Sequence, residues 1–169
     1  MKEKTLHVLE YNKIIEMLRE QAGSEMTKKV ISELMPYLDA SEIREHQTET
    51  TEAVRLIQHK GPLPVGGFYD IEEIVSLARK GGTLTMAQLL KVLYNMKNAE
   101  RVKAFLKGDV PDLPVLMAIA ELIAEHRDLS AEIDRCILSE DEMADNASPQ
   151  LRSIRRTIIR QNEALKAKI

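Results

Sequence analysis

Apolar residues recur at helical spacing along most of the chain. The first such face follows the i, i+3, i+4, i+7 rule and consists of Tyr11, Ile14, Ile15, Leu18 and Ala22. It predicts a helix that ends at Gly23. Only Thr5–Glu10 alternates in the manner of a strand, and this stretch could equally be an extended lead-in to the helix. The pattern therefore predicts an all-α, multi-helix bundle.

Capping residues and helix breakers predict the next two helices. Ser24 is expected to cap a second helix, which stops before Pro36. Ser41 is expected to begin a third helix, which ends near Lys60–Gly61. Its predicted inner face consists of Ile43, Thr50, Val54 and Ile57. The following stretch, GPLPVGGFYD, is too rich in proline and glycine for regular structure.

Two capping boxes predict the fourth and fifth helices. Asp70 with Glu73 forms the first box, and Gly81–Gly82 is expected to end its helix. Thr85 with Gln88 forms the second box, at the start of a long fifth helix.

Two shorter helices are predicted downstream. The stretch PDLPVLMAIAELIAEH is apolar over more than half of its circumference, so we expect it to be the most buried helix. Ser130 is expected to cap a seventh helix, AEIDRCIL, and the loop SEDEMADNA leads away from it.

The last predicted helix has a clear start and no sequence signal for its end. Ser148 suits the N-cap and Pro149 the first helical position. An apolar stripe follows and consists of Leu151, Ile154, Ile158 and Leu165. No Gly, Asn or Pro ends this pattern before Ile169. We therefore expect a helical domain at 1–147 and, at 148–169, a separate amphipathic helix without a stop signal.

Composition limits the classes of protein to consider. The chain is 44% hydrophobic and 30% charged, which is ordinary for a helical domain. No run of about 18 apolar residues could span a membrane, and the N-terminus has no apolar signal core. Cys136 is the single cysteine, which agrees with a reducing compartment. These features predict a cytoplasmic protein.

Charge is divided unevenly along the chain. Residues 151–169 hold six of the 24 lysines and arginines and one of the 27 acids, for a net charge of +5, whereas residues 1–150 carry −8. The candidate nucleic-acid-binding residues lie there: Arg152, Arg155, Arg156 and Arg160. Two interpretations remain open: these arginines pair with acids on a neighbouring helix, or they contact phosphate.

Candidate chemistry is sparse. The glycine loops at 61–68 and 80–85 lack the spacing of a phosphate-binding P-loop. The four histidines have no metal-ligand spacing among themselves or with Cys136, which also lacks a nearby base that would make it a nucleophile. The acidic loop at 139–145 lacks the spacing of a calcium site, so we expect Asp145 to help fix the entry of the last helix. No catalytic, cofactor-binding or metal-binding residue is predicted.

Several separated motifs resemble one protein family. They are the helix-pair opening at 9–36, the Glu-Thr-x-Glu-Ala stretch that begins at Glu49, the Pro-Gly loop with Asp-Ile, the Gly-Gly break, and Asp-x-Ala-Ser-Pro-x-Leu-x-x-Ile-Arg at 145–155. Together they resemble the N-terminal part of the second bacterial MutS family, the Smr-bearing paralogues of the mismatch-repair ATPase. The resemblance covers essentially the whole chain.

The resemblance implies a role for the chain within a larger machine. The family is associated with binding branched DNA to suppress recombination, with endonuclease activity, and with ATP-driven splitting of collided ribosomes. It implies a homodimeric parent that uses ATP and Mg²⁺ and has nucleic acid, DNA or ribosomal RNA, as its partner. Within this chain it implies a non-catalytic helical core domain at 1–147 and, at 148–169, the truncated start of a lever or coiled-coil helix. It implies no ATPase or nuclease motif and no cofactor within this chain.

A second hypothesis does not depend on the resemblance. The chain could be a free-standing helical adaptor that docks an acidic protein partner through its basic C-terminal helix. The open end of that helix favours the first hypothesis, because a complete adaptor is expected to cap its last helix.

Overall fold

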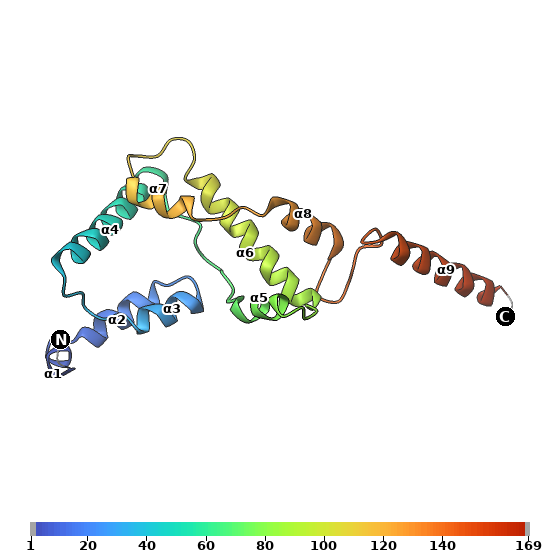
Figure 1. The fold of residues 1–169 in the computed structure, drawn as a ribbon, viewed down its shortest axis with the longest axis horizontal. Helices are drawn as coiled ribbons and strands as arrows, with labels where there is room; N and C mark the ends of the chain where they lie inside the picture. Colours follow the sequence, from blue (N-terminus) through green and yellow to red (C-terminus); the bar gives the residue numbers. More distant parts are fainter. Residues whose placement is uncertain (1–2, 168–169) are drawn as a thin grey trace. The chain divides into compact units, whose positions relative to one another are not determined.

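A computed structural model describes residues 3–167, and over this range the chain forms nine helices and no strand (Figure 1). The predicted all-α class is therefore confirmed. The helices are α1 (Glu3–Val8), α2 (Tyr11–Glu20), α3 (Glu25–Ser32), α4 (Ala40–Lys60), α5 (Glu72–Arg79), α6 (Met86–Phe105), α7 (Pro114–Glu121), α8 (Arg127–Cys136) and α9 (Pro149–Lys166).

The expectation of an extended segment at Thr5–Glu10 is wrong. Most of this stretch lies in α1, and the Leu9 N–H continues the helical pattern by donating to the Thr5 carbonyl oxygen at 3.0 Å. Glu10 then adopts the left-handed conformation, with φ of 54°, and separates α1 from α2. A few alternating residues without a partner strand do not outweigh local helical hydrogen bonds.

The chain divides into two compact units, each built from two separate stretches. The first unit comprises residues 1–70 and 97–125, and the second comprises 71–96 and 126–169. The boundary falls inside α6, which contributes its first part to the second unit and its last part to the first. The predicted division into a domain at 1–147 and a lever at 148–169 stays a prediction.

The core of the first unit lies between α4, the end of α6 and α7. Its most deeply buried side chains are Leu56 and Leu113, each 1% exposed. The predicted inner face of α4 is wrong, because Thr50, Val54 and Ile57 are exposed and Ile43 is only half-buried. Glu52 and Leu56 are the buried residues of α4, so the face of α4 that packs in the core is not the face predicted from the sequence.

Three charged side chains of the first unit bind helix ends. The Glu52 carboxylate accepts hydrogen bonds from the Val115 and Leu116 N–H groups, at 3.2 and 2.8 Å, at the start of α7. The Lys103 ammonium donates to the Ile123 carbonyl oxygen after the end of α7, at 2.7 Å. The Lys60 ammonium donates to the Phe105 carbonyl oxygen at the end of α6, at 2.6 Å. The negative carboxylate lies at the N-terminus of a helix and the two positive ammonium groups lie at helix C-termini, so each charge interacts favourably with the helix dipole.

The expectation that the segment of α7 is the most buried helix is wrong. Ala120 is its only buried residue, whereas Ile119 is 47% exposed and Leu122, just after the helix, is 84% exposed. The helix is short and packs on α4 with one face, which leaves its opposite apolar face uncovered within this unit.

The core of the second unit lies between α6 and α8, where Leu93, Ile133 and Ile137 are buried together. The predicted Thr85–Gln88 capping box is confirmed: the Thr85 N–H donates to Gln88 Oε1 at 2.9 Å, and the Gln88 N–H donates to Thr85 Oγ1 at 3.2 Å.

The helix predicted to begin at Ser41 begins one residue earlier, at Ala40, and the Asp39 carboxylate caps it by accepting from the Ser41 and Glu42 N–H groups. The N-cap of α5 is Ile71, so this helix begins one residue later than the predicted Asp70–Glu73 box placed it. The predicted cap at Ser130 is wrong. Ser130 lies inside α8, where its N–H donates to the His126 carbonyl oxygen at 2.9 Å. None of the helices in the described part of the chain is long and apolar enough to cross a membrane.

Candidate functional site

The start of α9 follows the prediction from sequence. Ser148 is the N-cap, its Oγ accepts from the Leu151 N–H at 3.1 Å, and Pro149 occupies the first turn. No described residue of α9 is buried. Most of the apolar stripe is exposed: Leu151 is half-buried, but Ile154 is 58% and Leu165 61% exposed.

A guanidinium group from α8 holds the turn that precedes α9. Arg135 donates to the Asn146 carbonyl oxygen at 2.6 Å and to the Ala147 carbonyl oxygen at 3.4 Å. The same group forms a forked ion pair with Glu132, one turn earlier on α8, at 2.5 and 3.0 Å. The hydrogen bond from Arg135 lowers the pKa of the Glu132 carboxyl group. Arg135 therefore ties the entry of α9 to α8.

A second arginine closes the same turn from the α9 side. Arg155 donates to the Met143 carbonyl oxygen at 2.9 Å and forms an ion pair with Asp145. This pair is how Asp145 fixes the entry of α9, as its position in the sequence predicted. We refer to Arg135, Glu132, Asp145 and Arg155 as the α8–α9 joint.

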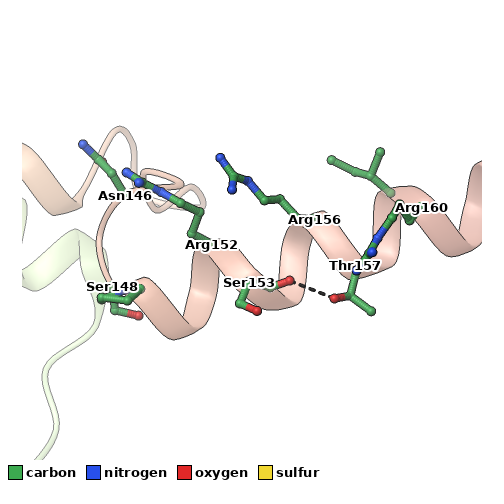
Figure 2. A pocket seen from close by; sticks show the side chains of 9 residues that line it. Asn146, Ser148, Arg152, Ser153, Arg156, Thr157 and Arg160 are labelled. Atoms are coloured by element: carbon green, nitrogen blue, oxygen red, sulfur yellow. Dashed lines mark hydrogen bonds between the residues drawn. The ribbon is translucent and has the colours of Figure 1, made fainter.

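The joint separates Arg155 from the other candidate residues. Arg152, Arg156 and Arg160 are exposed, and no acidic side chain within the described residues pairs with them. We refer to these three residues as the arginine ridge. They line an open hollow of about 700 Å³ on the surface of α9. Figure 2 shows Arg152 and Arg156 projecting from the same side of the helix, with Asn146 beside Arg152.

The remaining lining of the hollow offers few further groups for binding. The Thr157 hydroxyl donates to the Ser153 carbonyl oxygen of its own helix, at 3.0 Å (Figure 2). Ile159, also in the lining, is 57% exposed. The charged groups of the hollow are its three guanidinium groups, with the side chains of Asn146 and Ser153 as neutral polar neighbours.

The residues rejected as reactive or as ligands have ordinary structural surroundings. Burial raises the pKa of the Cys136 thiol, and a hydrogen bond to Glu132 raises it further, which disfavours the nucleophilic thiolate. Within residues 3–167, no three His, Cys, Asp or Glu side chains are grouped as a metal ion requires.

The glycine loops are engaged in turns. The Gly81 and Gly82 N–H groups donate to the Ala78 and Leu77 carbonyl oxygens, at 2.9 and 3.0 Å, and thereby end α5. The Gly67 N–H donates to the Gly23 carbonyl oxygen at 3.3 Å. These backbone donors are therefore not arranged as a phosphate cradle.

Sequence reasoning did not identify Arg135 as a residue that positions the site. Its spacing of three from Glu132 is visible in the sequence and indicates a pair on one helix. Its bonds to the carbonyl groups of Asn146 and Ala147 depend on the path of the intervening loop. No local sequence signal reveals that path.

Comparisons with known proteins agree with the family resemblance. No family model matches the chain. The whole chain aligns over 171 residues, at 42% identity, with a protein of Clostridium botulinum named Endonuclease MutS2. At 37% identity it aligns with a protein of the same name from Alkaliphilus oremlandii. Each alignment covers 22% of the relative, so the chain spans about a fifth of the length of these proteins. The resemblance to the second bacterial MutS family is confirmed.

Proposed function

We propose that this segment of a MutS2-family protein is a non-catalytic core and lever, and that α9 is the lever. One observation carries the proposal: α9 repeats an apolar stripe but buries none of its described residues. An isolated helix of about 20 residues is marginal in water, and most helical stability comes from tertiary packing. The stripe therefore requires a second helix, which the longer parent protein would supply.

The α8–α9 joint supports a mechanical role. Arg135 of α8 and Arg155 of α9 both donate hydrogen bonds to backbone carbonyl groups of the turn at residues 143–147. A displacement of α9 would therefore also displace α8. Ile133 and Ile137, in and just after α8, belong to the buried core with Leu93 of α6. In the parent, this connection would couple ATP-driven motion to a clamp around branched DNA or a collided ribosome.

Hydrogen exchange tests the lever directly. Amide exchange across 151–166 is compared between this chain and a full-length MutS2 relative. We expect rapid exchange of these amides in the chain and strong protection in the full-length protein, since the stripe is covered there. Equally rapid exchange in both proteins would contradict the lever.

The non-catalytic part of the proposal is tested with nucleotide. Because no loop of the chain has P-loop spacing, we predict that the 169-residue chain neither binds nor hydrolyses ATP. Isothermal titration with Mg²⁺-ATP is expected to give no binding heat. Magnesium-dependent binding at micromolar concentrations would contradict this part of the proposal.

The exposed arginine ridge also supports the alternative of an adaptor for an acidic protein partner. The same exchange experiment separates the two functions. An adaptor helix is complete in this chain and gains no protection from the rest of a full-length relative. A lever helix gains protection along its apolar stripe.

A further inference from the structure

We propose that the arginine ridge contacts the phosphate backbone of a nucleic acid while the apolar stripe, on the opposite face of α9, packs against another helix. This inference rests on the proposed lever role of α9. It adds which residues meet the nucleic acid and that their face stays open once the lever is assembled.

The geometry of α9 places the ridge and the stripe on opposite faces. An α-helix turns by about 100° per residue, so the centre of the ridge lies about 170° around the axis from the centre of the stripe. The hollow follows the ridge, because Arg152, Arg156 and Arg160 line it and the stripe residues Ile154 and Ile158 do not. A helix that covers the stripe therefore leaves the ridge exposed.

This arrangement weighs against the simpler explanation of the basic charge. Cations that pair with acids on a partner helix flank the apolar contact, as the e and g positions of coiled coils do. Of the four candidate arginines, Arg155 lies nearest to the stripe, and it is already bound to Asp145 and the Met143 carbonyl oxygen. The three ridge arginines lie too far around the helix to share that contact.

The shape and chemistry of the ridge fit a repeated anion. Its three residues come from successive turns, with Cα atoms about 6 Å apart along the axis, and no acid among the described residues pairs with them. Guanidinium binds phosphate oxygens through two parallel hydrogen bonds. The hollow contains no aromatic side chain on which a base could stack. The ridge therefore suits sequence-independent contact with phosphates of DNA or RNA.

The test measures binding of the 169-residue chain to labelled nucleic acid over a range of salt. The probes are a DNA duplex, an RNA duplex of the same length, and polyglutamate as an acidic polypeptide. The ridge variant combines Arg152→Gln, Arg156→Gln and Arg160→Gln. A control variant removes the same charge from exposed positions outside α9, by Lys29→Gln, Arg44→Gln and Arg55→Gln. A stripe variant combines Ile154→Ser and Ile158→Ser.

We expect the chain to bind both duplexes weakly, with a dissociation constant of about 10⁻⁴ to 10⁻⁶ M, as is usual for non-specific complexes. The ridge variant should lower the slope of log affinity against log salt by roughly two to three units, about one for each phosphate contact. The charge control and the stripe variant should retain the slope of the parent chain. A DNA-only or RNA-only effect would identify which phosphate backbone is the partner.

Three results would overturn the proposal. They are an unchanged slope in the ridge variant, equal losses in the ridge variant and the charge control, and binding of polyglutamate with neither duplex bound. Circular dichroism checks that the ridge variant is folded. If it is not, the three single variants Arg152→Gln, Arg156→Gln and Arg160→Gln replace it, and each should lower the slope by about one unit if its residue contacts a phosphate. If the binding test overturns the phosphate contact but the exchange experiment shows protection of the stripe, the proposed lever role of α9 still stands.

Discussion

At the scale of single residues, the buried carboxylate of Glu52 is the clearest departure from apolar packing. Its side chain is 3% exposed, and Glu52 belongs to the Glu-Thr-x-Glu-Ala stretch, one of the motifs that resemble the second bacterial MutS family. It accepts two backbone hydrogen bonds at the start of α7, where the N-cap Leu113 supplies none. A residue of α4 thus performs the capping role that a serine or aspartate usually performs locally.

Replacing Glu52 should therefore destabilise the first unit. Glu52→Ala leaves two N–H groups without their acceptor, and we predict a loss of about 1.5 to 3 kcal/mol in the free energy of unfolding. Urea denaturation followed by circular dichroism measures this loss. Glu45→Ala, an exposed acid on the same helix, serves as the control and should change stability by less than about 0.5 kcal/mol. Equal effects of the two variants would show that the cap contributes nothing.

The charge of His46 depends on its contacts with nearby side chains. Its ring stacks on Tyr37, with centroids 4.4 Å apart, and Nδ1 contacts Glu49 at 2.8 Å. The hydrogen bond to Glu49 raises the pKa of His46, and Glu42 and Glu45 add smaller effects in the same direction. Because the pKa is higher in the folded state, this stabilisation is complete below the unfolded pKa and is lost as pH rises through the folded one.

We predict that Glu49→Gln lowers the pKa of His46 and weakens the pH dependence of stability between about pH 5 and about pH 8. NMR titration of the imidazole signals measures the pKa. Denaturation at the two ends of this range measures the difference in stability. If the titration midpoint of His46 is the same in the parent and the variant, Glu49 is not the cause of the raised pKa.

At the scale of elements, signals contained within about one helical turn could be read from the sequence. Ser24, Thr85 with Gln88, and Ser148 all cap as predicted, because each cap and its acceptor or donor are three residues apart. Ser130 carries the same type of signal but lies inside α8. Its helix begins at Arg127, so a capping residue alone does not determine a boundary.

Interactions between distant residues could not be read in this way. Glu52 caps a helix whose first turn lies 63 and 64 residues further along the chain. The arginine ridge could be predicted, because a spacing of four residues is local. The bonds of Arg155 to Asp145 and to the Met143 carbonyl oxygen could not be predicted, because they depend on how the loop at 139–148 folds back.

The α8–α9 joint leads to a prediction at this scale. Arg135→Lys keeps the positive charge but removes the planar fork that reaches Glu132 and the Asn146 carbonyl oxygen together. We predict faster amide exchange and faster proteolysis at 143–151 in this variant. Arg152→Lys, in the exposed ridge, is the control and should leave both rates unchanged. Unchanged rates in Arg135→Lys would mean that the charge alone holds the turn.

At the scale of the whole molecule, α9 should contribute little to the stability of the chain on its own. None of its described residues is buried, and the α8–α9 joint connects it to the rest of the second unit. We predict that deleting residues 151–169 lowers the melting temperature by no more than a few degrees, since exposed ion pairs contribute about 1 kcal/mol or less. Leu56→Ala is the contrasting variant, because it truncates a side chain that is 1% exposed and should cost about 2 to 5 kcal/mol. A deletion that costs more than about 3 kcal/mol, as a whole core side chain does, would show that α9 packs on the body in solution, and the lever would then lack its free apolar face.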